Sequence, residues 1–219
     1  MNLITKITGD GSHTLFVPEL NEHYHSIHGA INESVHVYIE AGLKHIHTSD
    51  ISVFEIGFGT GLNAYLTLLF AMENKCKINY TAIELFPLDM NIVTGLNYSS
   101  CLKKENVSFL QLHKAQWNKK VIINDYFTMY KIKADLTEYK FFEKASLIYF
   151  DAFGPEKQPE LWKECILKKV TDILNPDGIF VTYSAKGIIK RILKSLSLKV
   201  ETIPGPKGKK EMIRAIKIV

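Results

Sequence analysis

A run of alternating glycines is the first feature of this sequence that can do chemistry. It reads Phe54-Glu55-Ile56-Gly57-Phe58-Gly59-Thr60-Gly61-Leu62-Asn63 and joins an apolar stretch to one of helical composition. Glycines let the backbone turn sharply and approach a ligand closely, and the first N–H groups of a helix offer it hydrogen bonds. A dinucleotide-binding turn has a glycine at its sixth position, where this sequence has Leu62. Since Glu55 also suits a ligand with a cationic amino group, we expect a small-molecule site other than NAD. A purely structural tight turn is the alternative.

Two further acidic residues end other apolar segments. Glu84 ends the segment 79–84, where a carboxylate can accept both hydroxyl protons of a ribose. Asp135 follows the segment 127–133, where it can accept a hydrogen bond from the amino group of an adenine. The alternatives are a solvated strand end for Glu84 and a helix cap for Asp135.

Asp151 opens the segment Asp151-Ala152-Phe153-Gly154-Pro155, directly after the apolar residues 146–150. In methyl transfer from a sulfonium, a carboxylate can bind an amine, direct its lone pair and stabilise the positive charge that grows on nitrogen. Phe153 can stack on a base, and nearby prolines restrict the loop. Asp151 is therefore the catalytic candidate, with a capping Asp beside a packed aromatic residue as the alternative.

These residues meet only if alternating strands and helices bring them to one edge of a sheet. The pattern predicts strands at 51–56, 79–84, 127–133, 146–150 and 178–183, helices at 62–72 and 161–174, and a turn at 175–178. Such alternation implies a parallel sheet, whose ligands bind outside the carboxyl ends of the strands. Residues 199–203 and 212–218 predict an antiparallel hairpin at the sheet edge.

Positive charge gathers at the end of the chain. The whole sequence has a net charge of +4, whereas residues 184–219 hold ten Lys or Arg against Glu201 and Glu211, which gives +8 there and −4 elsewhere. Lys and Arg displace counterions from phosphates, so this asymmetry fits a face that binds a polyanion. A solvated lysine-rich surface is the alternative.

Length and composition limit what else the chain can be. With 219 residues and 46% hydrophobic content, we expect one sizeable core. We expect a cytoplasmic protein without a membrane segment, because no signal-peptide pattern is present and the longest apolar stretch is short. The three cysteines are scattered, which favours reduced structural thiols. Seven of the eight histidines precede Asp50, but their spacing fits no familiar ligand signature, so we expect no metal.

The chain resembles the tRNA 5-methylaminomethyl-2-thiouridine methyltransferase family, the methyltransferase half of the bifunctional enzyme MnmC. The most specific matching segments are 57–63, 84–88 and 151–162, with further similarity at 21–26 and 209–212. The resemblance implies an α/β, Rossmann-like fold with a mostly parallel seven-stranded sheet, an antiparallel C-terminal edge and a small N-terminal extension. Residues 1–49 would be a cap and residues 50–219 the methyltransferase domain.

The resemblance also implies a reaction: methylation of 5-aminomethyl(-2-thio)uridine at the tRNA wobble position, with S-adenosylmethionine as donor, tRNA as partner and neither flavin nor metal. Asp151 would face the acceptor amine. Residues expected around the donor are Tyr24, Ser26, Glu55, Gly57, Gly59, Gly61, Asn63, Glu84 and Asp135. Residues expected to contact the substrate are Phe153, Ser184, Arg191, Lys209 and Lys210.

The chain departs from the family pattern in three positions and in its length. Gln158 stands where the pattern has Asn, and Lys190 and Lys209 stand where it has Arg. A lysine cannot make the bidentate contact that an arginine makes. The flavin oxidase half of the bifunctional relatives does not fit into 219 residues, so we expect a separate enzyme to supply the aminomethyl group.

Two other functions remain open. A methyltransferase or aminopropyltransferase for a small amine would keep the glycine turn without needing the basic tail. A non-catalytic RNA-binding module would bind tRNA without affinity for the donor. The role of the lysine-rich segment 113–126 does not follow from the sequence.

Overall fold

The computed structural model describes residues 2–48 and 50–218 of the chain. Eight strands of these residues form one sheet in the order β10-β11-β9-β8-β4-β5-β7-β6. Their bounds are β4 Asp50–Ile56, β5 Lys77–Glu84, β6 Lys120–Asn124, β7 Phe127–Lys133, β8 Ala145–Phe150, β9 Leu174–Thr182, β10 Leu198–Pro204 and β11 Glu211–Lys217. The α/β fold with a mostly parallel sheet is confirmed, but the expected number of seven strands is wrong.

The central strands β9, β8, β4, β5 and β7 are parallel, while β6 and β11 pair antiparallel at the two sides. The additional strand is β6, which pairs with β7 across a tight turn and lies inside the segment 113–126. Its signal was weak because Lys119 and Lys120 precede a short Val-Ile-Ile run. The expected C-terminal hairpin is confirmed as β10 and β11.

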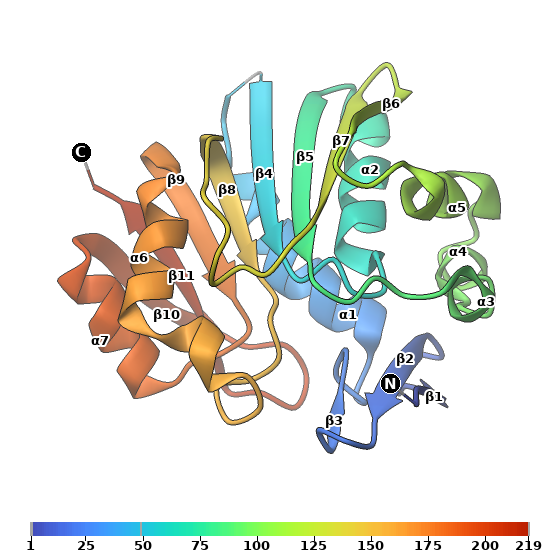
Figure 1. Ribbon diagram of the computed structural model, residues 1–219, viewed down its shortest axis with the longest axis horizontal. Helices are drawn as coiled ribbons and strands as arrows, with labels where there is room; N and C mark the ends of the chain where they lie inside the picture. Colours follow the sequence, from blue (N-terminus) through green and yellow to red (C-terminus); the bar gives the residue numbers. More distant parts are fainter. Residues whose placement is uncertain (1, 49, 219) are drawn as a thin grey trace.

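Helices cover both faces of the sheet (Figure 1). The helix α2 Leu62–Asn74 lies on one face, and α6 Glu164–Asp172 and α7 Gly187–Ser195 lie on the other. The helices α3 Met90–Val93, α4 Tyr98–Cys101 and α5 Asn106–Lys114 form a group beside α2 (Figure 1). Alternate residues of a strand point to opposite faces, so β4 sends Val53 into the core under α2 and Phe54 into the core under α6 and α7. In β8, Tyr149 and Phe150 divide between the two cores in the same way.

Two local predictions need correction. The helix expected over 161–174 is divided into a 3-10 turn, η3 Pro159–Trp162, and α6, because Lys163 takes an extended conformation between them. The turn expected at 175–178 lies within β9, where the pairing with β8 jumps from Ala145–Leu174 to Leu147–Ile179. Asp177 has a φ of 59° in this irregular stretch, as a turn residue would.

The N-terminal residues form a separate small sheet and a helical segment. The strands are β1 Ile4–Ile7, β2 His13–Val17 and β3 Glu22–His23, followed by α1 Ala30–Ser34, the π-helical η1 Val35–Glu40 and the 3-10 turn η2 Leu43–His45. In Figure 1 the small sheet lies beyond the ends toward which the arrows of β4 and β5 point. Residue 49, where we placed the boundary of the cap, lies outside the described residues. Within the described part of the chain, no helix combines the length and the apolar character needed to cross a membrane.

The chain order places a switch point next to β4. From β4 the chain proceeds to β5 and β7 on one side, and it then returns to β8 and β9 on the other side. Loops leaving β4 and β8 therefore diverge in opposite directions from neighbouring strands. Crevices at such points bind ligands in open α/β sheets.

Candidate active site

A pocket of about 1230 Å³ opens at the carboxyl ends of the parallel strands. The residues after β4, β5, β7, β8 and β9 contribute to its lining, and residues 20–27, Glu33 and the loop between β10 and β11 close its other sides. Of the predicted residues, the pocket wall contains Tyr24, Ser26, Gly57, Gly59, Asn63, Glu84, Asp135, Asp151, Phe153, Ser184, Lys209 and Lys210. Glu55, Gly61 and Arg191 lie outside this wall.

The glycine turn runs directly against the loop after β8. Asp151 donates its backbone N–H to the carbonyl of Ile56 at 3.0 Å, and a Cβ added to Gly57 would lie 2.9 Å from the carbonyl oxygen of Asp151. Gly57 also has a φ of 86°, a conformation that other residues rarely adopt. Gly61 is the N-cap of α2 and has a φ of 72°, so it turns the chain into the helix. Only glycine at residue 57 allows both the turn and the close approach.

Glu84 ties the end of β5 to the glycine turn. Its Oε2 accepts the N–H of Gly59 at 3.0 Å, and its Oε1 accepts the N–H of Phe86 at 2.8 Å. A carboxylate has about four acceptor positions, so Glu84 retains capacity for ribose hydroxyls. Its place in the pocket wall is compatible with the expected donor contact.

Asp135 caps its own loop. Its Oδ1 accepts hydrogen bonds from the N–H of Thr137 at 2.8 Å and from the hydroxyl of Thr137 at 2.7 Å. The loop continues as turns rather than as a helix. Asp135 therefore combines the capping role with a position in the pocket wall.

Asn63 links two carboxyl groups. Its Nδ2 donates to Asp151 Oδ2 at 2.7 Å and to Glu55 Oε1 at 3.0 Å. Glu55 is 0% exposed, because it points from β4 beneath the pocket rather than into it. Asn63 Oδ1 and Glu55 Oε2 are buried, and neither has a hydrogen-bond partner within residues 2–48 and 50–218. The free Asn63 Oδ1 fits a donor that carries an amino group, and Glu55 would hold Asn63 in place from below.

The same burial changes how the two acids ionise. Desolvation, together with the charge of Glu33, raises the pKa of Asp151 to about 7, although Tyr38, Asn63 and Lys209 counteract part of the rise. Burial, with the charge of Asp151, raises the pKa of Glu55 well above its usual range. At neutral pH, Asp151 is therefore close to the midpoint of its titration and able to exchange a proton.

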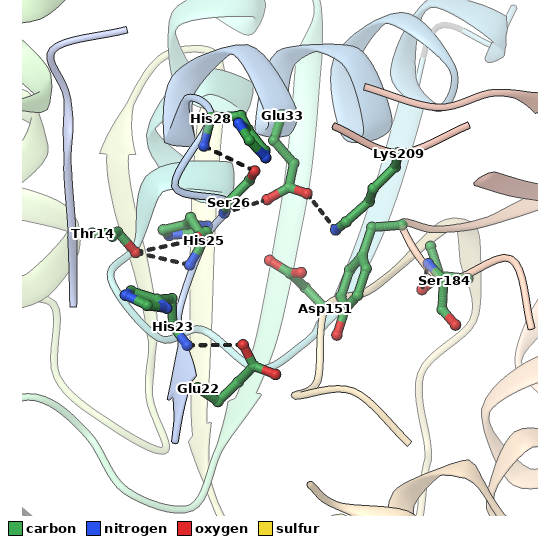
Figure 2. Close-up of polar contacts among 12 residues, drawn as sticks. Thr14, Glu22, His23, His25, Ser26, His28, Glu33, Asp151, Ser184 and Lys209 are labelled. Atoms are coloured by element: carbon green, nitrogen blue, oxygen red, sulfur yellow. Dashed lines mark hydrogen bonds and ion pairs between the residues drawn. The ribbon is translucent and has the colours of Figure 1, made fainter. Parts of the chain in front are cut away.

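The N-terminal segment covers the pocket with aromatic rings. Tyr24 meets Phe153 edge to face, with 5.1 Å between ring centroids, and its ring is 3.1 Å from the position of a Cβ on Gly59. Ser26 donates its backbone N–H to Glu33 Oε2 at 2.7 Å (Figure 2). Tyr24 and Ser26 are therefore placed at the pocket, as expected. Glu33 was not among the expected site residues.

Two histidines hold the glycine turn at Thr60. His25 Nε2 lies 2.6 Å from Thr60 Oγ1, and His113 Nε2 lies 3.0 Å from the Thr60 carbonyl oxygen. Burial lowers the pKa of each histidine to about 4. Among the described residues there is no group of three His, Cys, Asp or Glu that could hold a metal. Neither histidine had an expected role, because Thr60 is 35 residues from His25 and 53 residues from His113 in the chain.

The segment 113–126 supports the turn from the same side. Lys131 of β7 is 1% exposed, donates to the carbonyl of His113 at 2.6 Å and lies 4.5 Å from the ring centroid of Trp117. Phe58, in the glycine turn, packs on both His113 and Trp117. The segment therefore helps to position the glycine turn.

The basic tail divides into structural and exposed parts. Arg214 binds Glu201 at 2.9 Å in the hairpin, and Lys217 donates to the carbonyl of Leu174 at 2.8 Å. Lys186 and Lys210 line the pocket, whereas Arg191 is exposed on α7 outside it. The charge available to a partner is thus smaller than the +8 of the tail suggests.

Ser184 and Lys209 lie on the side of the pocket formed by β9 and the hairpin. Ser184 is 6% exposed and follows Tyr183, whose hydroxyl donates to the carbonyl of Ala152 at 2.9 Å. Lys209 forms an ion pair with Glu33 at 2.5 Å, and its ammonium lies 3.9 Å from the ring centroid of Tyr183. Tyr183 was not among the expected site residues.

Comparison with known proteins extends these observations. Residues 93–218 match the profile of a family described as S-adenosyl-L-methionine-dependent methyltransferase. The chain is 28% identical over 211 residues to the tRNA 5-methylaminomethyl-2-thiouridine biosynthesis bifunctional protein MnmC of Campylobacter hominis, over 92% of this chain and 31% of that protein. With the protein of the same name from Campylobacter fetus it shares 25% identity, over 94% of this chain and 34% of that protein. The chain spans about a third of the length of these curated relatives.

Solved structures show the same fold. The crystal structure of MNMC2 from Aquifex aeolicus matches with a TM-score of 0.78 and 23% identity, covering 98% of this chain and 69% of that one. Spermidine synthase from Thermotoga maritima matches with a TM-score of 0.56 and 15% identity, covering 99% of this chain and 72% of that one.

Proposed function

The chain belongs to the family of S-adenosyl-L-methionine-dependent methyltransferases, and from this premise we propose that it methylates the amine of 5-aminomethyl(-2-thio)uridine at the tRNA wobble position. The observation that carries the proposal is the contact between the glycine turn and the loop of Asp151 in one pocket. A donor site and a carboxylate for an amine are thereby adjacent. The relatives named for tRNA 5-methylaminomethyl-2-thiouridine biosynthesis support the choice of acceptor.

The donor would be held by the glycine turn, Glu84 and the amide oxygen of Asn63, with Tyr24 and Ser26 above it and Asp135 at the side. S-adenosylmethionine, when bound, supplies a methyl group on a sulfonium. Edge-to-face packing of Tyr24 and Phe153 would keep water from the space between donor and acceptor. Glu55 and Gly61 would act from beneath, through Asn63 and through the start of α2.

Asp151 would bind and orient the acceptor. Asn63 fixes Asp151 Oδ2, and a carboxylate has further acceptor positions for an amine N–H. This hydrogen bond would direct the nitrogen lone pair and stabilise the positive charge that develops during transfer. A pKa of about 7 lets Asp151 take a proton from the amine at neutral pH.

The tRNA would contact the basic rim of the pocket. Lys186 and Lys210 lie in the pocket wall, and Arg191 lies on α7, which begins just after Lys186. Phe153 would stack on a base, and Ser184 would contact the substrate beside it. Residues 1–49 would act as a cap on the methyltransferase domain of residues 50–219, since residues 20–27 and Glu33 cover the pocket. Because the amine must exist before it is methylated, a separate enzyme would supply it.

Nucleoside mass spectrometry tests the proposal directly. The protein is incubated with S-adenosylmethionine and tRNA that carries 5-aminomethyluridine, and we expect a gain of one methyl group on that base. Asp151→Ala should abolish the gain, and tRNA that lacks the aminomethyl group should stay unchanged. No methylation of this tRNA by folded, donor-binding protein would refute the proposal.

The salt dependence of methylation distinguishes a tRNA acceptor from a small-amine acceptor. Neutralising Arg191 and Lys210 together should weaken tRNA methylation and reduce its dependence on salt, because neither side chain forms an ion pair among the described residues. Lys186 is left unchanged in this test, since it pairs with Glu156. Unchanged activity and unchanged salt dependence would favour a small amine. Arg214 is unsuitable for this test, since it binds Glu201 inside the hairpin.

A further inference from the structure

The ammonium group of Lys209 occupies a position inside the pocket that suits an alkylammonium. It lies 2.5 Å from Glu33 Oε1 and 3.9 Å from the ring centroid of Tyr183. Asp151 lies in the same pocket, close enough for the charges of Glu33 and Lys209 to shift its pKa in opposite directions. Figure 2 shows Glu33, Lys209 and Asp151 on facing sides of one space.

The groups around this ammonium are held in place without it. Glu33 Oε2 accepts the backbone N–H of Ser26 at 2.7 Å, which fixes the carboxylate. The hydroxyl of Tyr183 donates to the carbonyl of Ala152 at 2.9 Å, which fixes the ring. These anchors belong to three distant parts of the chain, so the arrangement forms only in the folded protein.

Lys209 is the more exposed member of the ion pair. Its side chain is 34% exposed, whereas that of Glu33 is 9% exposed. Lysine carries its charge on a flexible four-carbon stem, and the loop between β10 and β11 gives this stem access to solvent. A buried carboxylate is strongly destabilised when its partner is removed, so Glu33 requires a cation at all times. One ammonium can replace another there without a change in net charge.

We propose that Lys209 is a stand-in for the acceptor: Glu33, Tyr183 and Asp151 form a seat for an alkylammonium, and the protonated amine of the substrate displaces the Lys209 ammonium from it. Glu33 and Tyr183 then determine specificity for a cationic amine, because a neutral acceptor cannot compensate the Glu33 charge that Lys209 leaves. This inference rests on the proposed function, since it takes an amine as the acceptor. It changes the expected role of Lys209 from a tRNA contact to an occupant of the amine site.

The test uses ethylammonium chloride as the probe, with the whole chain and without tRNA or donor. Lys209→Met keeps the apolar stem and empties the seat. Its thermal denaturation midpoint should rise with ethylammonium, with an apparent affinity about tenfold higher than that of the wild type, in which the probe must displace Lys209. Ethanol and sodium chloride at equal concentrations should give no such rise.

Two variants make the test specific. Lys210→Met removes the adjacent lysine of the same pocket wall, so its response to ethylammonium should equal that of the wild type. Lys209→Met combined with Glu33→Gln should lose the gain, because the carboxylate that holds the cation is gone. If Lys209→Met loses its native circular dichroism, Lys209→Gln removes the same charge while keeping a donor to Glu33, and it should show the same gain. A response that is absent from the Lys209 variant, or equal in the double variant, would overturn the inference.

The outcomes separate this inference from the proposed function. Methylation of aminomethyl tRNA without a selective ethylammonium response would leave the function standing and reject the seat. A selective response without methylation of that tRNA would keep the seat and reject the tRNA substrate.

Discussion

The two halves of the pocket are built in different ways. On the proposed donor side, the carboxylate of Glu84 accepts the backbone N–H groups of Gly59 in the glycine turn and of Phe86, at the ends of neighbouring parallel strands. On the proposed acceptor side, Glu33 of α1, Tyr183 at the end of β9 and Lys209 of the hairpin loop meet one another. The donor side is thus set by the sheet, whereas the acceptor side depends on side chains that are distant in sequence. We infer that changes on the donor side affect folding and binding together, and that changes on the acceptor side affect the choice and turnover of substrate.

The largest expected effect is on the rate of methyl transfer and comes from substitution of Asp151. Asp151→Ala should lower the rate of methyl transfer by about 10²–10³-fold, as the loss of one preorganised electrostatic contact does in other enzymes. Binding of S-adenosylmethionine, measured by calorimetry, should change much less, because the glycine turn and Glu84 remain. An equal loss of donor affinity would contradict the division into two halves.

Gly57→Ala tests the donor side. The new Cβ would lie 2.9 Å from the carbonyl oxygen of Asp151 at a φ of 86°, so we expect a loss of roughly 1–3 kcal/mol in the free energy of unfolding, together with weaker donor binding. Chemical denaturation and calorimetry measure these two effects. Gly95→Ala is the matched control, since its Cβ would be 3.4 Å from the nearest atom and its φ is not positive. A fully active, fully stable Gly57→Ala would show that the turn does not need this close approach.

The pH dependence sharpens the acceptor side. In the proposed reaction, Asp151 must be ionised to bind and deprotonate the amine. Because its pKa is raised to about 7, we expect kcat/KM to fall about tenfold per pH unit below pH 7 and to level off above it. The pH dependence of stability runs in the opposite direction to that of kcat/KM. A carboxyl whose folded pKa is raised above the unfolded value of 3.8 binds its proton more tightly when folded, so the ionised group costs stability as the pH rises through this window. Asp151→Asn should therefore melt higher than the wild type at pH 8 while being inactive; a lower melting temperature there would contradict the raised pKa.

The smallest expected effect concerns the basic residues. Neutralising Lys210 should reduce the slope of log binding constant against log salt concentration for tRNA by about 0.7–0.9, if Lys210 contacts one phosphate. Arg214→Ala should leave this slope unchanged and lower the free energy of unfolding by about 0.5–1 kcal/mol, because it breaks a partly exposed pair with Glu201. Filter binding over a salt series and chemical denaturation provide the two readouts. A change of slope in Arg214→Ala would place that residue on the tRNA surface instead.

The sequence predicted the donor side better for a physical reason. Strand periodicity and the glycine turn are local patterns, and the predicted strand over 127–133 agrees with β7 Phe127–Lys133. Because parallel strands bring their carboxyl ends to one edge, these local patterns also placed Glu84 and Asp151 in one pocket. The direction of Glu55 was missed, because the pattern does not show that Asn63 lies between this carboxyl and the pocket.

The acceptor side and the edges of the fold were harder to predict. Glu33 and Lys209 are separated by 176 residues in the chain, and their pairing depends on how the hairpin loop packs against α1. The strand β6 is stabilised by pairing with β7, although its own residue Ile122 is 76% exposed and gives no alternation of buried residues. Both features come from tertiary contacts, for which the sequence contains no short-range signal.

The grip of His25 and His113 on Thr60 has a consequence for acidified conditions. With pKa values of about 4, both imidazoles stay uncharged down to mildly acidic pH, so their contacts with the turn do not change over that range. The two histidines that hold the glycine turn therefore keep their protonation state in mild acid, whereas Asp151 becomes protonated. If the proposed function holds, we expect mild acid to slow methyl transfer through Asp151 without breaking the contacts of the two histidines with Thr60.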